Sequence, residues 1–124
     1  MSLKKFIAAT VLGVLPLSAF AGEVQLVMVE QPGCAYCAAW KDEIGPAYPH
    51  TAEGKFAPLV LADLHIGPPE GTDYARRVNF TPTFILTEDG QEMARIEGYP
   101  GENFFWPILS NLLQDHTEFQ PPTH

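Results

Sequence analysis

Hydrophobic positions between residues 22 and 115 form short runs, followed by one longer periodic stretch. Four short runs of β-branched and other apolar residues predict β-strands. They cover residues 24–29, 57–64, 80–87 and 92–97. Between the first two runs, residues 34–44 are mostly good helix formers, and the following Gly45-Pro46 predicts where that helix ends. Strand, helix and strand in this order favour a parallel pair joined by a right-handed crossover.

The second half of the chain predicts a hairpin and a closing helix. Asp89-Gly90 separates the last two runs and is a strong signal for a tight turn between antiparallel strands. Six apolar residues then recur at helical spacing and predict a helix over about 102–114 with one broad apolar face. They are Phe104, Phe105, Ile108, Leu109, Leu112 and Leu113. Pro107 is expected in the first turn, where a missing N–H costs least, or else the helix begins one turn later.

The remaining segments carry weaker signals. Residues 48–55 are polar and rich in turn formers, and the two prolines within 66–71 predict a loop. Thr72 to Val78 is expected to form a short helix with Thr72 or Asp73 as its cap. We therefore expect one domain at residues 22–115 and a flexible C-terminal tail at residues 116–124.

Residues 1–21 have the layout of a secretory signal peptide. Lys4 and Lys5 precede an apolar stretch, Phe6–Phe20, and Ala19-Phe20-Ala21 fits a small-x-small cleavage site. A membrane-spanning helix is disfavoured because the stretch is shorter than the roughly 20 residues needed and contains a proline. Cleavage after Ala21 predicts a protein exported to an oxidising compartment, the periplasm.

Charge narrows the classes of partner. The 124 residues include 7 basic and 15 acidic side chains, and two of the basic ones belong to the predicted signal peptide. The rest would carry a formal charge of −10 with neutral histidines, which does not suit nucleic acid as a partner. The four histidines, scattered among predicted loops and the tail, show no spacing typical of metal ligands.

The chain has two cysteines, in Cys34-Ala35-Tyr36-Cys37, between the first predicted strand and the first predicted helix. The opening turn of a helix has unpaired N–H groups and the positive end of the helix dipole, which favour a thiolate. In a Cys-x-x-Cys motif the thiol pKa falls from about 8.5 to roughly 3.5–7.5. This placement predicts that Cys34 is the attacking thiol and that Cys37, facing inward beside Trp40, is the resolving thiol.

Other interpretations of the pair fit the same residues less well. A structural disulfide closing so small a loop would stabilise the fold by only about 2 kcal/mol before any strain. A zinc site would need a second Cys-x-x-Cys or a nearby histidine pair. A redox-active disulfide between Cys34 and Cys37, with no metal and no other cofactor, is therefore favoured. A copper(I) metallochaperone using the same two thiolates stays open as the alternative.

The order of the predicted elements resembles the thioredoxin superfamily over nearly all of residues 22–115. Two motifs carry the resemblance, the Cys-x-x-Cys pair and Thr81-Pro82-Thr83. The resemblance implies an α/β, three-layer sandwich with a central mixed four-stranded sheet flanked by helices. It also implies that Pro82 follows a cis peptide bond facing the dithiol and that the backbone of Thr81 pairs with a substrate chain as an added strand.

A narrower resemblance joins the chain to periplasmic thioredoxins encoded with bacterial sulfur-oxidation genes. It rests on residues 30–34, 45–49 and 97–102. It implies a thiol–disulfide oxidoreductase that reduces a disulfide or a thiol adduct on a periplasmic protein, with a sulfur-carrier protein as the partner. It also implies an inner-membrane thiol transporter as the electron donor. The uncharged Ala35-Tyr36 pair between the cysteines favours a reductant over a strong oxidase.

The sequence departs from classical thioredoxins beside the cysteines. Gln31-Pro32-Gly33 replaces the tryptophan that precedes the motif, and Met28 stands where a buried acid is expected. Glu30 is a candidate for proton transfer at Cys37, with a solvated strand-end carboxylate as the alternative.

Two aromatic residues flank the motif. Tyr36 is expected either to tune the dithiol and face a partner or to pack beside the site. Trp40 is expected in the core, with a covering role over the cysteines as the second interpretation.

Overall fold

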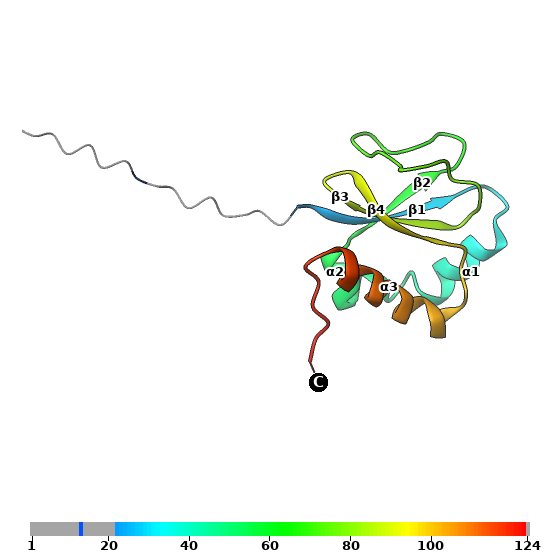
Figure 1. Cartoon of the computed structure of the whole chain (residues 1–124). Coiled ribbons are helices and arrows are strands. Elements are labelled where there is room, and N and C mark those ends of the chain that lie inside the picture. Colours follow the sequence, from blue (N-terminus) through cyan, green and yellow to red (C-terminus); the bar gives the residue numbers. More distant parts are fainter. Residues whose placement is uncertain (1–12, 14–21, 124) are drawn as a thin grey trace, which may run out of the picture.

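The computed structural model describes residue 13 and residues 22–123, so the predicted signal peptide lies outside the described part, apart from Gly13. Figure 1 shows a twisted sheet with the three α-helices gathered on one face and a long loop crossing the other. In the described part of the chain, no helix is long and apolar enough to cross a membrane.

The sheet is mixed, as predicted, and has the strand order β2-β1-β3-β4. Its strands are β1 (Val24–Glu30), β2 (Leu59–Asp63), β3 (Thr83–Glu88) and β4 (Gln91–Glu97). The central strand β1 runs parallel to β2 and antiparallel to β3. The β3–β4 hairpin turns through Asp89 and Gly90, whose φ angles of 52° and 80° are the left-handed pair that a two-residue turn of this kind requires. The predicted parallel pair and the predicted hairpin are both confirmed.

One face of the sheet is covered by helices. These are α1 (Ala35–Glu43), the 3₁₀ turn η1 (Tyr48–His50), α2 (Ala52–Phe56) and α3 (Glu102–His116). Trp40 lies at the centre of this layer, with its ring 5.3 Å from Phe84 and 5.8 Å from Phe105 between centroids. Burial of such large aromatic side chains contributes strongly to the hydrophobic stabilisation of this face.

An irregular segment covers the opposite face, and the predicted helix from Thr72 to Val78 is wrong. The backbone of Asp73 pairs with the hairpin instead, because its N–H donates to Gly90 O at 2.8 Å and its carbonyl accepts from Glu92 N at 3.2 Å. Arg95 donates to the carbonyl of Arg76 at 2.9 Å. Backbone groups engaged in this way cannot close helical turns. The segment still contributes to a second apolar cluster through Val78, which is buried.

Helix α3 differs from its prediction in two respects. Only Phe105, Leu109 and Leu113 are buried, whereas Phe104 and Ile108 are exposed, so the apolar face is narrower than the sequence pattern indicates. Pro107 lies in the second turn rather than the first. The helix begins at Glu102 because Gly101, with a φ of 99°, starts it abruptly and its carbonyl accepts from Phe105 N at 2.9 Å.

The residues after α3 are not a loose tail throughout. The hydroxyl of Thr117 donates to the carbonyl of Leu113 and accepts from Phe119 N at 3.1 Å, which turns the chain back toward the domain. Phe119 is 3% exposed, and its ring lies 5.3 Å from that of Phe56 in α2. The packed domain therefore extends to Phe119, beyond the predicted limit of residue 115.

Candidate active site

Cys34 and Cys37 form a disulfide, with an S–S distance of 2.12 Å and a Cα–Cα distance of 5.2 Å. Cys34 is the N-cap of α1, and its sulfur accepts a hydrogen bond from Cys37 N at 3.1 Å. Cys34 is half-buried, whereas Cys37 is 4% exposed and belongs to the main core. Cys34 is thus the more accessible of the two sulfurs, which suits an attacking thiol, and Cys37 is the buried one, which suits a resolving thiol.

The loop before Cys34 places its sulfur at the positive end of the helix. Gly33 has a φ of 78°, which a residue with a side chain rarely adopts, and Cys34 N then donates to Gln31 O at 3.3 Å to close the turn. A thiolate at Cys34 would accept the same N–H of Cys37 that the sulfur accepts in the disulfide. Both this hydrogen bond and the helix dipole stabilise negative charge at Cys34.

Thr81 and Pro82 come from the start of β3 and lie beside the cysteine motif. The Thr81–Pro82 peptide bond is cis, as the resemblance implied. These two residues line a cavity of about 280 Å³ together with Tyr36, Gly98 and Tyr99. Tyr36, which is 67% exposed, thus extends from α1 to the mouth of this cavity rather than packing into the core.

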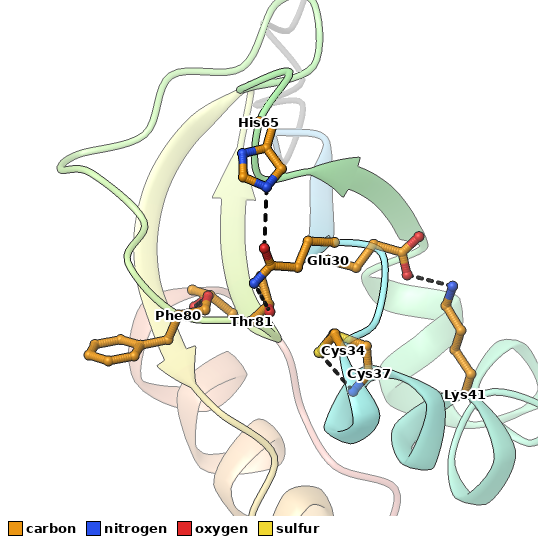
Figure 2. Close-up of a disulfide and its surroundings, with 9 residues drawn as sticks. Glu30, Cys34, Cys37, Lys41, His65, Phe80 and Thr81 are labelled. Atoms are coloured by element: carbon orange, nitrogen blue, oxygen red, sulfur yellow. Dashed lines mark hydrogen bonds and ion pairs between the residues drawn. A yellow bond between two sulfur atoms is a disulfide. The ribbon is translucent and has the colours of Figure 1, made fainter.

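A larger cavity of about 550 Å³ lies against the disulfide and is lined by both cysteines. Glu30, Lys41 and Asp63 provide its charged groups. Glu30 Oε2 lies 2.5 Å from Lys41 Nζ, so the strand-end carboxylate forms an ion pair rather than being simply solvated. Figure 2 shows this pair on one side of the disulfide and Thr81 on the other.

Met28 and Trp40 form part of the apolar layer behind the disulfide. Both are fully buried in the same cluster as Cys37. The expectation that Trp40 lies in the core is confirmed, and its indole N–H has no hydrogen-bond partner among the described residues. Met28 offers no titratable group, and the carboxylates that share a cavity with the disulfide are those of Glu30 and Asp63.

Tyr99 borders the smaller cavity and is held by α1. Its hydroxyl donates a hydrogen bond to the Glu43 carboxylate at the end of that helix. Partial burial, this hydrogen bond and the nearby charge of Glu102 raise the pKa of Tyr99 above its ordinary value. The hydroxyl therefore stays a neutral donor at physiological pH.

Sequence reasoning missed Gln31, His65 and Lys41. Gln31 Nε2 donates to Thr81 Oγ1 at 2.8 Å, and Gln31 Oε1 lies 3.3 Å from His65 Nε2 (Figure 2). No spacing in the sequence indicates these contacts, because His65 follows Gln31 by 34 residues and Thr81 follows it by 50 residues. The contact of Lys41 with Glu30 also has no local signal, because it depends on how the loop between β1 and α1 folds.

Metal ligands are few around the site. Within residues 22–123 and residue 13, no group of three or more His, Cys, Asp or Glu side chains is arranged to hold a metal ion. A copper(I) ion would therefore have the two cysteine sulfurs as its ligands from this part of the chain.

The sheet order, the disulfide at the start of α1 and the cis-proline beside it together define a thioredoxin-like protein. A family model described as the thioredoxin-like domain matches residues 19–113, and the chain belongs to this family. Among solved structures, the chain is similar to the periplasmic thioredoxin SoxS from Paracoccus pantotrophus, in its reduced form. The identity is 51% and the TM-score 0.72, and the match covers 74% of this chain and 97% of that chain.

Other comparisons add little. A thioredoxin from Malassezia sympodialis, Mala s 13, matches at 16% identity with a TM-score of 0.49, covering 77% of this chain and 76% of that chain. Nothing about function follows from similarity at that level. A search of curated proteins finds no match. A thioredoxin-like fold with a Cys-x-x-Cys pair supports thiol–disulfide oxidoreductase chemistry in general.

Proposed function

We propose that this protein is a periplasmic thiol–disulfide oxidoreductase that reduces a disulfide or a thiol adduct on a protein partner of sulfur oxidation. The observation that carries the proposal is the arrangement of the two sulfurs. Cys34 caps α1 with its sulfur at the positive end of the helix, and the buried Cys37 is already bonded to it. The 51% identity to a periplasmic thioredoxin supports the compartment.

The exchange has two steps. The Cys34 thiolate attacks one sulfur of the partner's disulfide, which forms a mixed disulfide and releases the partner's other sulfur as a thiolate. The Cys37 thiolate then attacks Cys34 Sγ, which releases the second partner thiol and leaves the Cys34–Cys37 disulfide. Two electrons pass from the protein to the partner, and Cys37 gives up its proton before it attacks.

Glu30 is our candidate to take that proton. It lines the same cavity of about 550 Å³ as Cys37, and its carboxylate, which contacts Lys41 there, is a proton-accepting group on that side of the disulfide. A Glu30→Gln variant should lower the pKa of Cys37, because removal of a nearby negative charge favours the thiolate. The pKa is measured by thiol alkylation in the Cys34→Ser background. Glu118→Gln, placed after α3 and away from the cysteines, is the matched control. An unchanged Cys37 pKa would remove Glu30 from the mechanism.

Thr81, Pro82 and Tyr36 are proposed to hold the partner chain. They line the cavity of about 280 Å³ beside the cysteine motif, and Thr81 lies outside β3. Both observations support pairing of the Thr81 backbone with an extended segment of the partner. The partner proposed from the family resemblance is a sulfur-carrier protein with a disulfide or a modified cysteine. The electron donor proposed in the same way is an inner-membrane thiol transporter.

Trapping tests the roles of the two cysteines. A Cys37→Ala variant should accumulate a covalent complex with its partner in periplasmic extract, because the mixed disulfide at Cys34 can no longer be resolved. A Cys34→Ala variant should trap none, and equal trapping by the two variants would overturn the assignment. Non-reducing electrophoresis followed by mass spectrometry of the complex reads both out and identifies the partner.

Redox equilibration tests the direction of transfer. The protein should be equilibrated in glutathione buffers of graded potential, with free thiols counted after acid quenching. A potential near the −270 mV of thioredoxin supports a reductant, whereas one near the −120 mV of DsbA would contradict it. Titration of the reduced protein with copper(I) covers the alternative. Tight stoichiometric binding without disulfide reduction would replace the oxidoreductase with a metallochaperone.

A further inference from the structure

Gln31 connects the loop that carries the cysteines to the segment that leads into β3. It is half-buried, and its side-chain amide donates to Thr81 Oγ1 at 2.8 Å. The same amide accepts from His65 Nε2 at 3.3 Å, so it also reaches the loop that follows β2. In Figure 2 the dashed lines run from His65 to Thr81 on one side of the disulfide.

The segment around Thr81 has supports of its own on the side of β4. Thr83 Oγ1 donates to Phe80 O at 2.7 Å, and Gly98 N donates to Pro82 O at 2.7 Å. Neither bond relates this segment to the cysteines. Among the hydrogen bonds of residues 22–123, the one from Gln31 joins residues 80–83 directly to the loop that carries Cys34.

His65 supports Gln31 from the far side. Its backbone N–H donates to Asp63 Oδ1 at 2.7 Å, which holds the start of that loop against the end of β2. A chain of contacts therefore runs from the end of the sheet through His65 and Gln31 to Thr81. A primary amide suits the middle position because it donates and accepts at once without adding a negative charge three residues before Cys34.

We propose that Gln31 is a positioning residue that fixes the distance between the Cys34 sulfur and the backbone of Thr81. The inference rests on the proposed function, in which a partner chain pairs with Thr81 while its sulfur is attacked by Cys34. A polypeptide must meet both constraints at once, so its reaction depends on that distance. A small disulfide meets only the sulfur, so its reaction does not depend on the distance.

The experiment compares two probes on pre-reduced protein. Insulin supplies disulfides within a polypeptide, and 5,5′-dithiobis(2-nitrobenzoate) supplies a small aromatic disulfide. The Gln31→Met variant keeps the length of the side chain and removes both hydrogen bonds. We expect the second-order rate with insulin to fall about three- to tenfold, the loss typical of one or two hydrogen bonds, with the rate toward the small disulfide within about twofold of the wild type.

Gln114→Met is the matched control. Gln114 lies exposed on α3 and bonds only to Ser110 within its own helix. It should leave both rates unchanged. Equal loss of both rates in the Gln31→Met variant would show that Gln31 acts on the thiol itself, and no loss of either would show that it positions nothing; both results overturn the proposal.

A double-mutant cycle tests the bond to Thr81. Thr81→Val removes the hydroxyl and should lower the insulin rate by the same factor as Gln31→Met. The double variant should be no slower than either single variant, and Thr81→Ser, which keeps the hydroxyl, should retain most of the wild-type rate. Fully additive losses would mean that the two residues act separately, contrary to the proposal.

Failure of the proposed function would look different. A wild-type protein that reduces neither probe is not a disulfide reductase, and the positioning role of Gln31 falls with that function. A wild-type protein that reduces both probes, with a Gln31→Met variant indistinguishable from it, retains the function and loses the inference.

Discussion

Phe119 offers a direct test of whether the residues after α3 belong to the folded domain. Its side chain is 3% exposed and packs on Phe56, with ring centroids 5.3 Å apart. Replacement of a buried phenylalanine by alanine costs about 3–5 kcal/mol, and a site near the chain end can relax, so we expect about 2–3 kcal/mol for Phe119→Ala. For a domain of this size, that loss lowers the melting temperature by about 10–20 °C.

Phe104→Ala is the matched control for this measurement. Phe104 is also a phenylalanine near the C-terminus, but it is 65% exposed on the outer side of α3. Its replacement should change the free energy of unfolding by less than about 0.5 kcal/mol. Both variants are measured in the oxidised form by urea unfolding and by circular dichroism on heating. Equal stabilities for the two variants would show that the residues after α3 do not pack as described.

Three further predictions concern buried polar groups and α3. Burial, and secondarily the charge of nearby Glu53, raises the pKa of Tyr48 above its ordinary 10.0. The contribution of Tyr48 to stability is therefore complete below pH 10, and it is lost at higher pH because the unfolded chain ionises first. The wild type should therefore lose more free energy of unfolding between about pH 9 and pH 11 than Tyr48→Phe does. Pro107 is exposed in the second turn of α3. Pro107→Ala should raise the free energy of unfolding, measured in urea, by about 1–3 kcal/mol because it restores a helical N–H. The side chains of Arg95 and Glu92 are each 4% exposed and lie 2.5 Å apart. Arg95→Met should therefore lower the free energy of unfolding by about 3–5 kcal/mol, because it leaves a buried carboxylate unpaired. A loss below about 1 kcal/mol would mean that the carboxylate finds another partner.

The candidate site was predictable where local sequence places its residues. The order of strand, Pro-Gly turn and helix is enough to put Cys34 at a helix N-terminus and Cys37 on the inner face one turn later. The cis bond before Pro82 followed from the family resemblance and is confirmed. The roles of Thr81 and Glu30 remain predictions. Thr81 lies beside the cysteine motif, and Glu30 is paired with Lys41.

Contacts between loops were not predictable in the same way. The sequence shows His65 only as one of four histidines in predicted loops or the tail, and Gln31 only as part of the segment that replaces a tryptophan. Each side chain is polar and partly exposed, so neither leaves a periodic signal, and their meeting depends on how three loops close over the sheet. The failed helix at 72–78 has the same cause, since Arg95 and the hairpin bind backbone groups that local propensity assigns to helical turns.

The sequence by itself determined the elements whose signals are local: the four strands, the tight turn at Asp89-Gly90, the two longer helices and the placement of the cysteine pair. Periodicity and turn chemistry act over a few residues, and these parts agree with the structure. Only the tertiary structure decided which apolar residues of α3 face the sheet, that Phe119 joins the core, and that Gln31 bridges Thr81 and His65. Those outcomes depend on competition among distant groups for the same buried surface and the same hydrogen bonds, which no local pattern records.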